Sequence, residues 1–278
     1  MLRIHAAVLL FGMAGLFGKF LALPAWAIVL GRTVFAAIAL GALIALGKTV
    51  KLPRGTQTIL HFALQGALLS VHWITFFHAI QISSVAVGLL AFSTFPVFIT
   101  LLEPWWFDEA YRGMDVVTAL MVIMGLGIMV APEPFGGRMV AGVFWGTISG
   151  LTFAILSLLN RQWAISVSPV AIAFYQNSFA ALTLLPMLAV VQLDVDPVEL
   201  GWLALLGVVC TATAHVFFIH GLKAIRAQLA AVIACLEPVY GIVFAYVLLN
   251  ERPTSYTLCG GGVILLTTIV AMRKRASV

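Results

Sequence analysis

The sequence predicts an all-α integral membrane protein whose ten transmembrane helices form two inverted-topology repeats of five helices. Three observations predict this fold: an apolar composition, ten apolar segments of helix length, and a residue pattern that occurs twice. Of the 278 residues, 63% are hydrophobic and 9% are charged, whereas soluble domains carry about 25% charged residues. A soluble protein of this composition would expose large apolar patches. The composition therefore excludes a soluble enzyme and a soluble nucleic-acid-binding protein.

The apolar segments are separated by short breaks that contain charges, proline or glycine. A transmembrane helix needs roughly 20 apolar residues, which is close to the length of these segments. Strands of a membrane barrel are about half as long and alternate apolar with polar residues, so helices are the better interpretation. We expect helices at Ile4–Leu23, Ala25–Leu46, Thr58–Ile80, Val85–Leu102, Gly113–Ala131, Met139–Leu159, Pro169–Val191, Leu200–Leu222, Gln228–Leu249 and Tyr256–Met272.

The positions of lysine and arginine predict that both termini are cytoplasmic. With the N-terminus placed inside, eleven of the fifteen cationic residues fall in cytoplasmic segments, and only Arg138 and Arg252 fall in outer loops. This is a strong positive-inside bias. The net charge of +5 then reflects topology and contact with anionic lipid. We expect the protein to lie in the cell inner membrane, in contact with the lipid bilayer. We do not expect it to bind nucleic acid.

The chain carries one pattern in both of its halves. At an offset of 144 residues, Ala27-Ile28, Phe35-Ala36-Ala37 and Leu40 recur as Ala171-Ile172, Phe179-Ala180-Ala181 and Leu184. At an offset of 142 residues, His78, Pro96-Val97 and Glu109 recur as His220, Pro238-Val239 and Glu251. Five spans are an odd number, so the second half enters the membrane from the opposite side. We therefore expect repeats at residues 1–134 and 135–278, with a binding site near the midplane between them.

Two such halves, each ending near a Pro-x12-Glu pattern, resemble the drug/metabolite transporter superfamily of the EamA type. The stretch from Leu236-Glu237-Pro238 to Leu249-Asn250-Glu251-Arg252 carries most of the resemblance. The resemblance implies export of small metabolites, amino acids and their derivatives, or lipophilic cations. It also implies a cavity lined mainly by helices 1, 3, 4, 6, 8 and 9. The first half departs from the pattern, because Phe95 precedes Pro96 where Glu237 precedes Pro238, so a strictly symmetric mechanism is not expected.

Three ionisable residues lie within the apolar segments, where a charge costs about 2.5–3.5 kcal/mol on insertion scales. Glu237, near the middle of the ninth segment, is interpreted either as a site for a substrate ammonium or a proton, or as a carboxyl group that joins two helices. Arg32, which is Gln176 in the second half, is interpreted as structural, with carboxylate binding as the alternative. Lys19 is expected to reach the membrane interface. Its alternative role is to attract a substrate carboxylate at the outer mouth.

Polar and aromatic side chains on the predicted cavity helices are candidates for substrate contact. His61, Gln65, His72 and Thr75 share one face of the third segment, and a face this polar should avoid lipid. Each of these residues also has a purely structural interpretation as an ordinary packing or hydrogen-bonding group. The candidate substrate contacts are Glu237, His72, Trp73, Thr75, Trp145, Ser149, Thr152, Thr211, His215, Phe217 and Tyr240.

Other residues are candidates for opening and closing the pathway. Pro96 and Pro238 interrupt backbone hydrogen bonding at corresponding depths and are either static kinks or hinges. His78 and His220 are expected near opposite membrane faces. Trp163 either closes the inner mouth or belongs to the interfacial aromatic belt. Gly142, Gly146 and Gly150, four residues apart, would let the sixth helix approach a neighbour closely.

The function that we expect is a secondary transporter that exports small amphiphilic metabolites, with amino acids as the favoured class, by alternating access between the halves. One alternative is proton-coupled efflux of lipophilic cationic drugs, and another is a non-transporting membrane assembly protein. No His-Glu-x-x-His, Gly-x-Ser-x-Gly or Asp-Asp motif lies within a segment, so we do not expect an enzyme. Neither a metal nor a cofactor is expected. The partners are a small-molecule substrate and protons as a candidate coupling ion, and the oligomeric state stays open.

Overall fold

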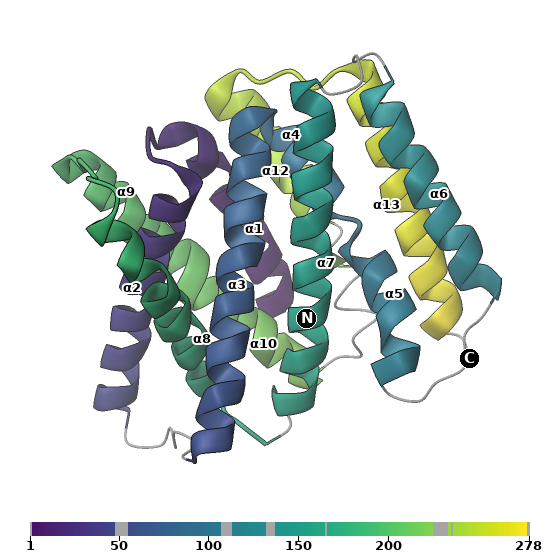
Figure 1. Cartoon of the computed structure of the whole chain (residues 1–278). Helices are drawn as coiled ribbons and strands as arrows, with labels where there is room; N and C mark the ends of the chain where they lie inside the picture. Colours follow the sequence, from purple (N-terminus) through teal and green to yellow (C-terminus); the bar gives the residue numbers. More distant parts are fainter. Residues whose placement is uncertain are drawn as a thin grey trace.

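The computed structural model describes residues 2–47, 55–106, 113–131, 137–164, 166–224, 233–234 and 236–276, whose helices form one bundle (Figure 1). No strand occurs within these ranges, so the prediction of an all-α protein is confirmed for them. The described helices are α1 (Leu2–Phe20), α2 (Ala25–Leu46), α3 (Thr56–Ile82), α4 (Val85–Phe92), α5 (Phe95–Trp106), α6 (Gly113–Val130), α7 (Arg138–Ala164), α8 (Pro169–Leu184), η1 (Leu185–Ala189), α9 (Pro197–Gly207), η2 (Val208–Thr213), α10 (Ala214–Ala224), α12 (Glu237–Leu249) and α13 (Ser255–Ala276).

The chain is a multi-pass membrane protein by the length and composition of these helices. Among the described residues, seven helical stretches are long and apolar enough to cross a membrane, and three shorter apolar helices lie at Val116–Val130, Glu237–Leu249 and Ser255–Val270. Each of the ten predicted segments overlaps one of these stretches. The predicted cytoplasmic residues Lys48, Lys51, Arg54, Arg112 and Arg226, and the repeat residue Glu109, lie outside the described residues.

The fourth predicted segment contains two helices, α4 and α5, because the chain turns at Ser93 and Thr94. The Ser93 hydroxyl donates to the carbonyl of Leu89 at 2.9 Å, and the Thr94 hydroxyl donates to the carbonyl of Ala91 at 2.8 Å. Both carbonyls also accept backbone N–H bonds, from Ser93 at 3.0 Å and from Thr94 at 3.2 Å, so each residue caps the end of α4 twice. Pro96 lies in the first turn of α5, where its missing N–H costs nothing. Pro238 has the same position in the first turn of α12.

The eighth predicted segment contains a π-helical turn, η2, between α9 and α10. The Thr211 hydroxyl donates to the carbonyl of Leu206, five residues earlier, at 2.7 Å, and Thr213 does the same with Val208 at 3.0 Å. Thr211 also accepts a hydrogen bond of 2.9 Å from Nε of Arg32, whose side chain is only 1% exposed. The wide turn therefore joins α2 to the eighth segment through a buried polar contact, and such turns are frequent at functional sites.

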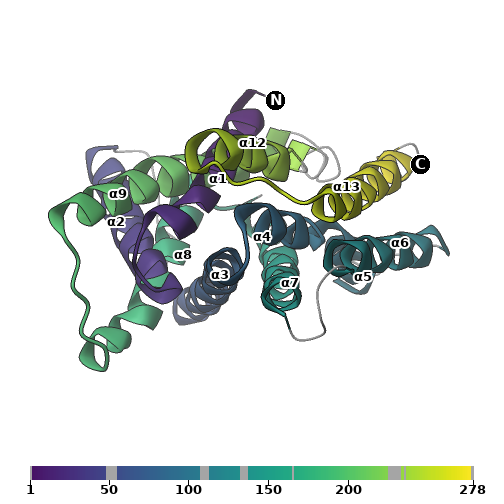
Figure 2. The ribbon, with the colours of Figure 1, turned by 90° about the horizontal axis from the view of Figure 1, so that it is seen from above.

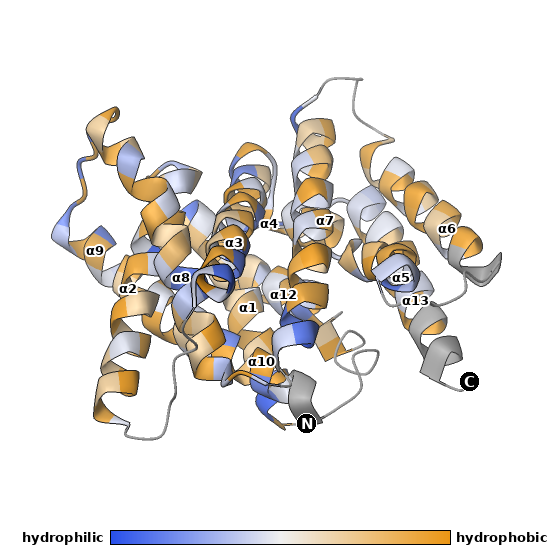
Figure 3. Ribbon diagram, turned by 60° about the horizontal axis from the view of Figure 1, so that its bottom comes forward, coloured by the Kyte–Doolittle hydropathy of each residue, from blue (hydrophilic) through white to orange (hydrophobic). Residues whose placement is uncertain are grey.

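Helix packing places α3 among α2, α4, α7 and α8, while α1 packs against α10 and α12. Helices α6 and α13 lie together at one edge of the bundle, away from α2 and α9 (Figure 2). Apolar residues make up much of the helices (Figure 3), and Leu60, Leu64 and Val247 are more than half exposed. An apolar outer surface of this kind is suited to lipid tails rather than to water.

Glycines bring α7 into close contact with α4, as their spacing predicts. A methyl group on Gly142 would meet Ser83, and one on Gly150 would lie 2.8 Å from the carbonyl of Phe92. A methyl group on Gly146 would lie 2.6 Å from Cβ of Ala91 and 3.2 Å from the carbonyl of Gly88. Because the helix backbones touch here, any side chain on this face forces them apart.

Gly146→Ala is therefore expected to destabilise the protein, although alanine favours a helix over glycine by up to about 1 kcal/mol. The matched control is Gly127→Ala in α6, because a methyl group there meets nothing within 4 Å. The measurement is the thermal unfolding midpoint in detergent, which should fall for the first variant and stay equal or rise for the second. Equal midpoints for the two variants would show that α4 and α7 are not in close contact.

Thr211→Val keeps the side-chain shape but removes the acceptor for Arg32. Thr213→Val is the matched control, because Thr213 makes the same bond to the carbonyl five residues earlier without holding an arginine. Leaving a buried donor unpaired costs about 1–3 kcal/mol, so the Thr211 variant should unfold at a temperature lower by several degrees. A midpoint no lower than that of the Thr213 variant would contradict the structural role of the Arg32–Thr211 bond.

Candidate functional site

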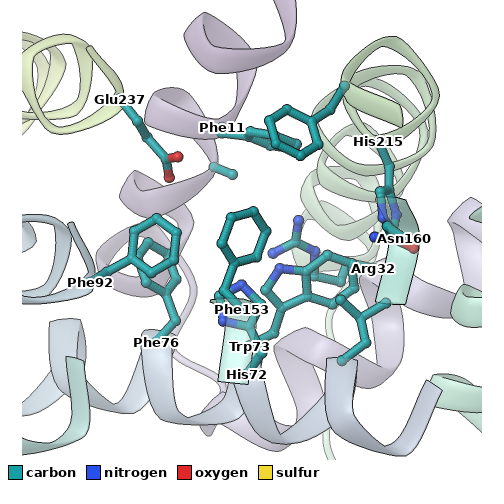
Figure 4. A pocket seen from close by; sticks show the side chains of 13 residues that line it. Phe11, Arg32, His72, Trp73, Phe76, Phe92, Phe153, Asn160, His215 and Glu237 are labelled. Carbon is teal, nitrogen blue, oxygen red and sulfur yellow. The ribbon is translucent and has the colours of Figure 1, made fainter. Parts of the chain in front are cut away.

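A cavity lies inside the bundle where seven helices meet (Figure 4). Aromatic and aliphatic side chains form most of its wall, and five polar or charged side chains interrupt them. The lining residues are Phe11 and Ala14 of α1, Arg32 of α2, Leu69, His72, Trp73 and Phe76 of α3, Phe92 of α4, Phe153 and Asn160 of α7, His215 and Phe218 of α10, and Glu237 of α12.

The cavity is small in this arrangement of the helices. Its volume is about 40 Å³, and a buried water needs roughly 10–15 Å³ in the same measure. The cavity therefore has room for a few waters, and an amino-acid-sized solute fits only after the walls move apart.

Glu237 reaches the cavity because it begins α12. The chain turns at Leu236, and Pro238 in the first helical turn fixes the direction of the helix. Gly12 of α1 lets α12 approach, since a methyl group there would lie 3.0 Å from the backbone oxygen of Glu237. The carboxylate points toward the space between Phe11, Phe92 and Phe153 (Figure 4), and no hydrogen bond or ion pair joins it to another described residue. Glu237 is 7% exposed, so its carboxylate is nearly buried and has no partner among the described residues.

Arg32 enters the cavity from α2, a helix that the resemblance does not place in the lining. Its guanidinium lies 3.9 Å from the ring centre of Trp73 and 5.4 Å from that of Phe77, which are cation–π distances. Nε is bound to Thr211, whereas the two terminal nitrogens have no hydrogen-bond partner among the described residues. A guanidinium held in this way can bind a carboxylate with both terminal nitrogens. The structural interpretation of Arg32 and the binding interpretation therefore apply together.

Glu237 and Arg32 are opposite charges in the wall of one cavity. Among the described residues they do not form an ion pair with each other. Figure 4 shows them on different sides of the aromatic side chains. A solute with one cationic and one anionic group could therefore contact both residues at once.

Hydrogen bonds from α7 hold His72 in place. Its Nδ1 lies 3.0 Å from the carbonyl oxygen and 2.8 Å from the hydroxyl oxygen of Ser149. The Ser149 hydroxyl in turn donates to the carbonyl of His72 at 3.0 Å. Ser149 thus orients a cavity residue and lies behind the wall itself.

An amide cluster lies behind Asn160 and His215. Gln176 Nε2 donates to the side-chain oxygens of Gln65 and Asn160, both at 2.6 Å. Asn177 Nδ2 donates to the carbonyl of Ala173 at 2.8 Å and lies 3.4 Å from Nδ1 of His215. Gln176 is the sequence counterpart of Arg32 in the second half. Each half therefore buries a polar side chain at this position.

The predicted substrate contacts divide into three groups. His72, Trp73, His215 and Glu237 line the cavity, while Ser149 and Thr211 hold His72 and Arg32. The remaining predicted contacts lie outside the lining. The hydroxyls of Thr75 and Thr152 donate to carbonyls of their own helices. The ring of Trp145 contacts that of His78. Phe217 packs on the hydrophobic core, and Tyr240 lies beside Gly12.

None of the predicted gating residues is among the residues that line the cavity, although Pro238 directly follows Glu237. His220 bonds to Arg3, and Trp163 contacts the rings of His61 and Phe62. Lys19, the predicted outer-mouth charge, donates to the carbonyls of Gln81 and Ser83 at 3.3 and 3.0 Å, which caps the end of α3. Glu103 of α5 forms an ion pair with Arg161 of α7, a link that the sequence does not predict.

Several cavity residues were not predicted from the sequence, because most of them are apolar. Leu69 and Phe76 follow the same helical face as Gln65 and His72, so the polar stripe of α3 could have identified them. In the same way, Phe153 and Asn160 are four and eleven residues after Ser149, which places all three on one face of α7. The other residues missed were Phe11, Ala14, Phe92 and Phe218.

Comparison with known proteins agrees with the fold. The EamA-like transporter family matches residues 1–131 and 140–273. An uncharacterized transporter of Archaeoglobus fulgidus is 29% identical over 225 residues, which cover 80% of this chain and 78% of that protein. An S-adenosylmethionine uptake transporter of Rickettsia conorii is 25% identical over 218 residues, which cover 77% and 72% of the two chains. One crystal structure shares the fold with a TM-score of 0.70 at 21% identity, over 97% of this chain and 95% of that one. The family and the two named relatives are transporters rather than enzymes, and the chain belongs to the EamA-like transporter family.

Proposed function

We propose that the protein exports small amphiphilic zwitterions of the amino-acid type by alternating access. The observation that carries this proposal is the pair of opposite charges, Arg32 and Glu237, in the wall of one aromatic cavity. Glu237 would bind the ammonium group and Arg32 the carboxylate. The aromatic side chains of Trp73, Phe76 and Phe153 would contact the apolar part of the solute.

The relatives that are named for uptake of S-adenosylmethionine support this substrate class. Their substrate has an α-amino and an α-carboxyl group, and a positively charged sulfonium links these to an aromatic base. A cavity with two opposite charges and an aromatic wall suits such a molecule or a simple apolar amino acid. Those relatives are named for uptake, so the export direction rests on the family resemblance.

We also propose that the chain consists of ten spans in two inverted repeats, residues 1–134 and 135–278. Two packing relations support this. Helix α1 packs on α12 as α7 packs on α5, and α2 packs on α9 as α8 packs on α3. These are the exchanged contacts that a two-fold relation between the halves requires. The two separate family matches end close to the proposed boundary.

Contacts between the proposed halves at both ends of the bundle support alternating access. At one end, Arg161 pairs with Glu103 and Arg3 bonds to His220. At the other end, Glu251 accepts from the backbone N–H of Ala86, and Glu199 accepts from that of Ala22, both at 3.2 Å. Opening either mouth would break one set and keep the other. The turn at Ser93 and Thr94 before Pro96, and the turn before Pro238, are the proposed hinges.

The proposed location is the inner membrane with both termini in the cytoplasm. The two ends of the described chain lie toward the same end of the bundle (Figures 1 and 3), as an even number of spans requires. The positive-inside bias of the sequence selects the cytoplasmic side.

Proton-coupled efflux of lipophilic cations is the second candidate, because the Glu237 carboxylate points among aromatic rings. Aromatic rings attract cations, and a lone carboxylate can exchange a proton for a cationic substrate. Under this alternative, Arg32 would be a purely structural residue.

Proteoliposomes with the purified protein should transport labelled L-phenylalanine faster than empty vesicles. Glu237→Gln and Arg32→Gln should each lower this flux by roughly 10–100-fold, because each removes a charge-assisted bond of about 1.5–3 kcal/mol. Asp194→Asn and Arg138→Gln, which neutralise a carboxylate and a guanidinium outside the cavity, should keep it. A wild-type flux equal to that of empty vesicles would exclude the proposed substrate class.

Phenethylamine, which lacks the carboxylate, separates the two candidates. For a zwitterion transporter, Arg32→Gln should reduce phenylalanine flux by a larger factor than phenethylamine flux. For a cation exporter, wild-type protein should transport phenethylamine better than phenylalanine, and Glu237→Gln should abolish that flux. The measurement is initial flux of each labelled solute into matched vesicles.

A further inference from the structure

We propose that hydrogen bonds behind the cavity wall make Asn160 and His215 into donors, which together with Arg32 form a surface for the carboxylate of the solute. The inference rests on the proposed function, since it concerns how that site distinguishes the two ends of a zwitterion. It gives a specificity role to Asn160 and positioning roles to Gln176 and Asn177.

The bond from Gln176 decides what Asn160 offers to the cavity. The Asn160 oxygen accepts from Gln176 Nε2 at 2.6 Å, so the amide nitrogen, with two hydrogens, is the group left over. The bond from Gln176 is the one side-chain hydrogen bond of Asn160 to another described residue, and Asn160 lines the cavity. Asn160 is therefore a hydrogen-bond donor toward a bound solute.

His215 is made a donor in a similar way. Asn177 Nδ2 lies 3.4 Å from Nδ1 of His215, and an amide nitrogen can only donate. Nδ1 is then the acceptor, so neutral His215 carries its proton on Nε2. A histidine in this tautomer donates from Nε2.

His72 has the opposite polarity. Its Nδ1 donates to the carbonyl of Ser149, since a carbonyl can only accept. Neutral His72 therefore has an unprotonated Nε2, which accepts. The cavity then has donors at Arg32, Asn160 and His215, and acceptors at Glu237 and His72. Figure 4 shows Arg32, Asn160 and His215 on the side of the cavity away from Glu237.

The cost of the amide cluster indicates that it serves more than stability. Gln65 and Gln176 are no more than 1% exposed, yet Nε2 of the first and Oε1 of the second have no partner among the described residues. In an apolar bundle each such group costs several kcal/mol. Apolar side chains of the same size would avoid that cost, but they could not orient Asn160.

The test compares binding of L-phenylalanine and phenethylamine to purified protein in nanodiscs, for the wild type and three variants. Asn160→Asp replaces the donor with an acceptor of the same size, and Gln176→Leu removes the group that orients Asn160. Ser157→Ala is the control, because it removes another buried unpaired polar group of α7 outside the lining.

Asn160→Asp should weaken phenylalanine binding at least tenfold without weakening phenethylamine binding. Gln176→Leu should lower the preference for phenylalanine over phenethylamine by a smaller factor. Ser157→Ala should leave that preference unchanged. A structural role alone would weaken both ligands equally. Asn177→Leu, acting through His215, gives a second variant if the aspartate protein does not fold.

The outcomes separate this inference from the proposed function. If wild-type protein does not bind phenylalanine, the proposed function fails. If it binds phenylalanine but the preference over phenethylamine is the same in every folded variant, the proposed function stands and the donor surface is refuted.

Discussion

The site depends on one buried charge, the guanidinium of Arg32. A charged group in an apolar bundle is stable only when its donors and its charge are met by nearby groups. Thr211 supplies an acceptor from η2, and Trp73 supplies an aromatic face from α3. Three helical segments are thereby held around the same point. The π turn belongs to this arrangement, because it places a threonine hydroxyl within reach of α2.

Much of the fold could be predicted because a membrane leaves few solutions for an apolar chain. Each long apolar segment becomes a helix, so the helix positions follow from the breaks between them. The break between α4 and α5 did not follow, since Ser93 and Thr94 are short polar residues that also occur inside helices. The same limit applies to η2, whose Cys210, Thr211 and Thr213 have no sequence signature of a wide turn.

The candidate site could be predicted where a polar residue stands in an apolar segment, as Glu237, His72 and His215 do. Phe92 and Phe153 could not, because a phenylalanine that lines a cavity has the same sequence context as one that faces lipid. Arg32 was identified as unusual, but the length of its side chain decided its role. It reaches the cavity from a helix that would otherwise lie at the periphery.

The opposite charges of Arg32 and Glu237 also have a consequence for the membrane voltage. With both groups charged, the cavity has no net charge, and a bound zwitterion adds none. Moving the loaded or the empty site through the field then requires no electrical work. A monovalent amine would add one charge, and its exit from a negative interior would cost about 2.3 kcal/mol per 100 mV. The membrane potential would thus favour export of zwitterions over cations before any contact in the cavity discriminates between them.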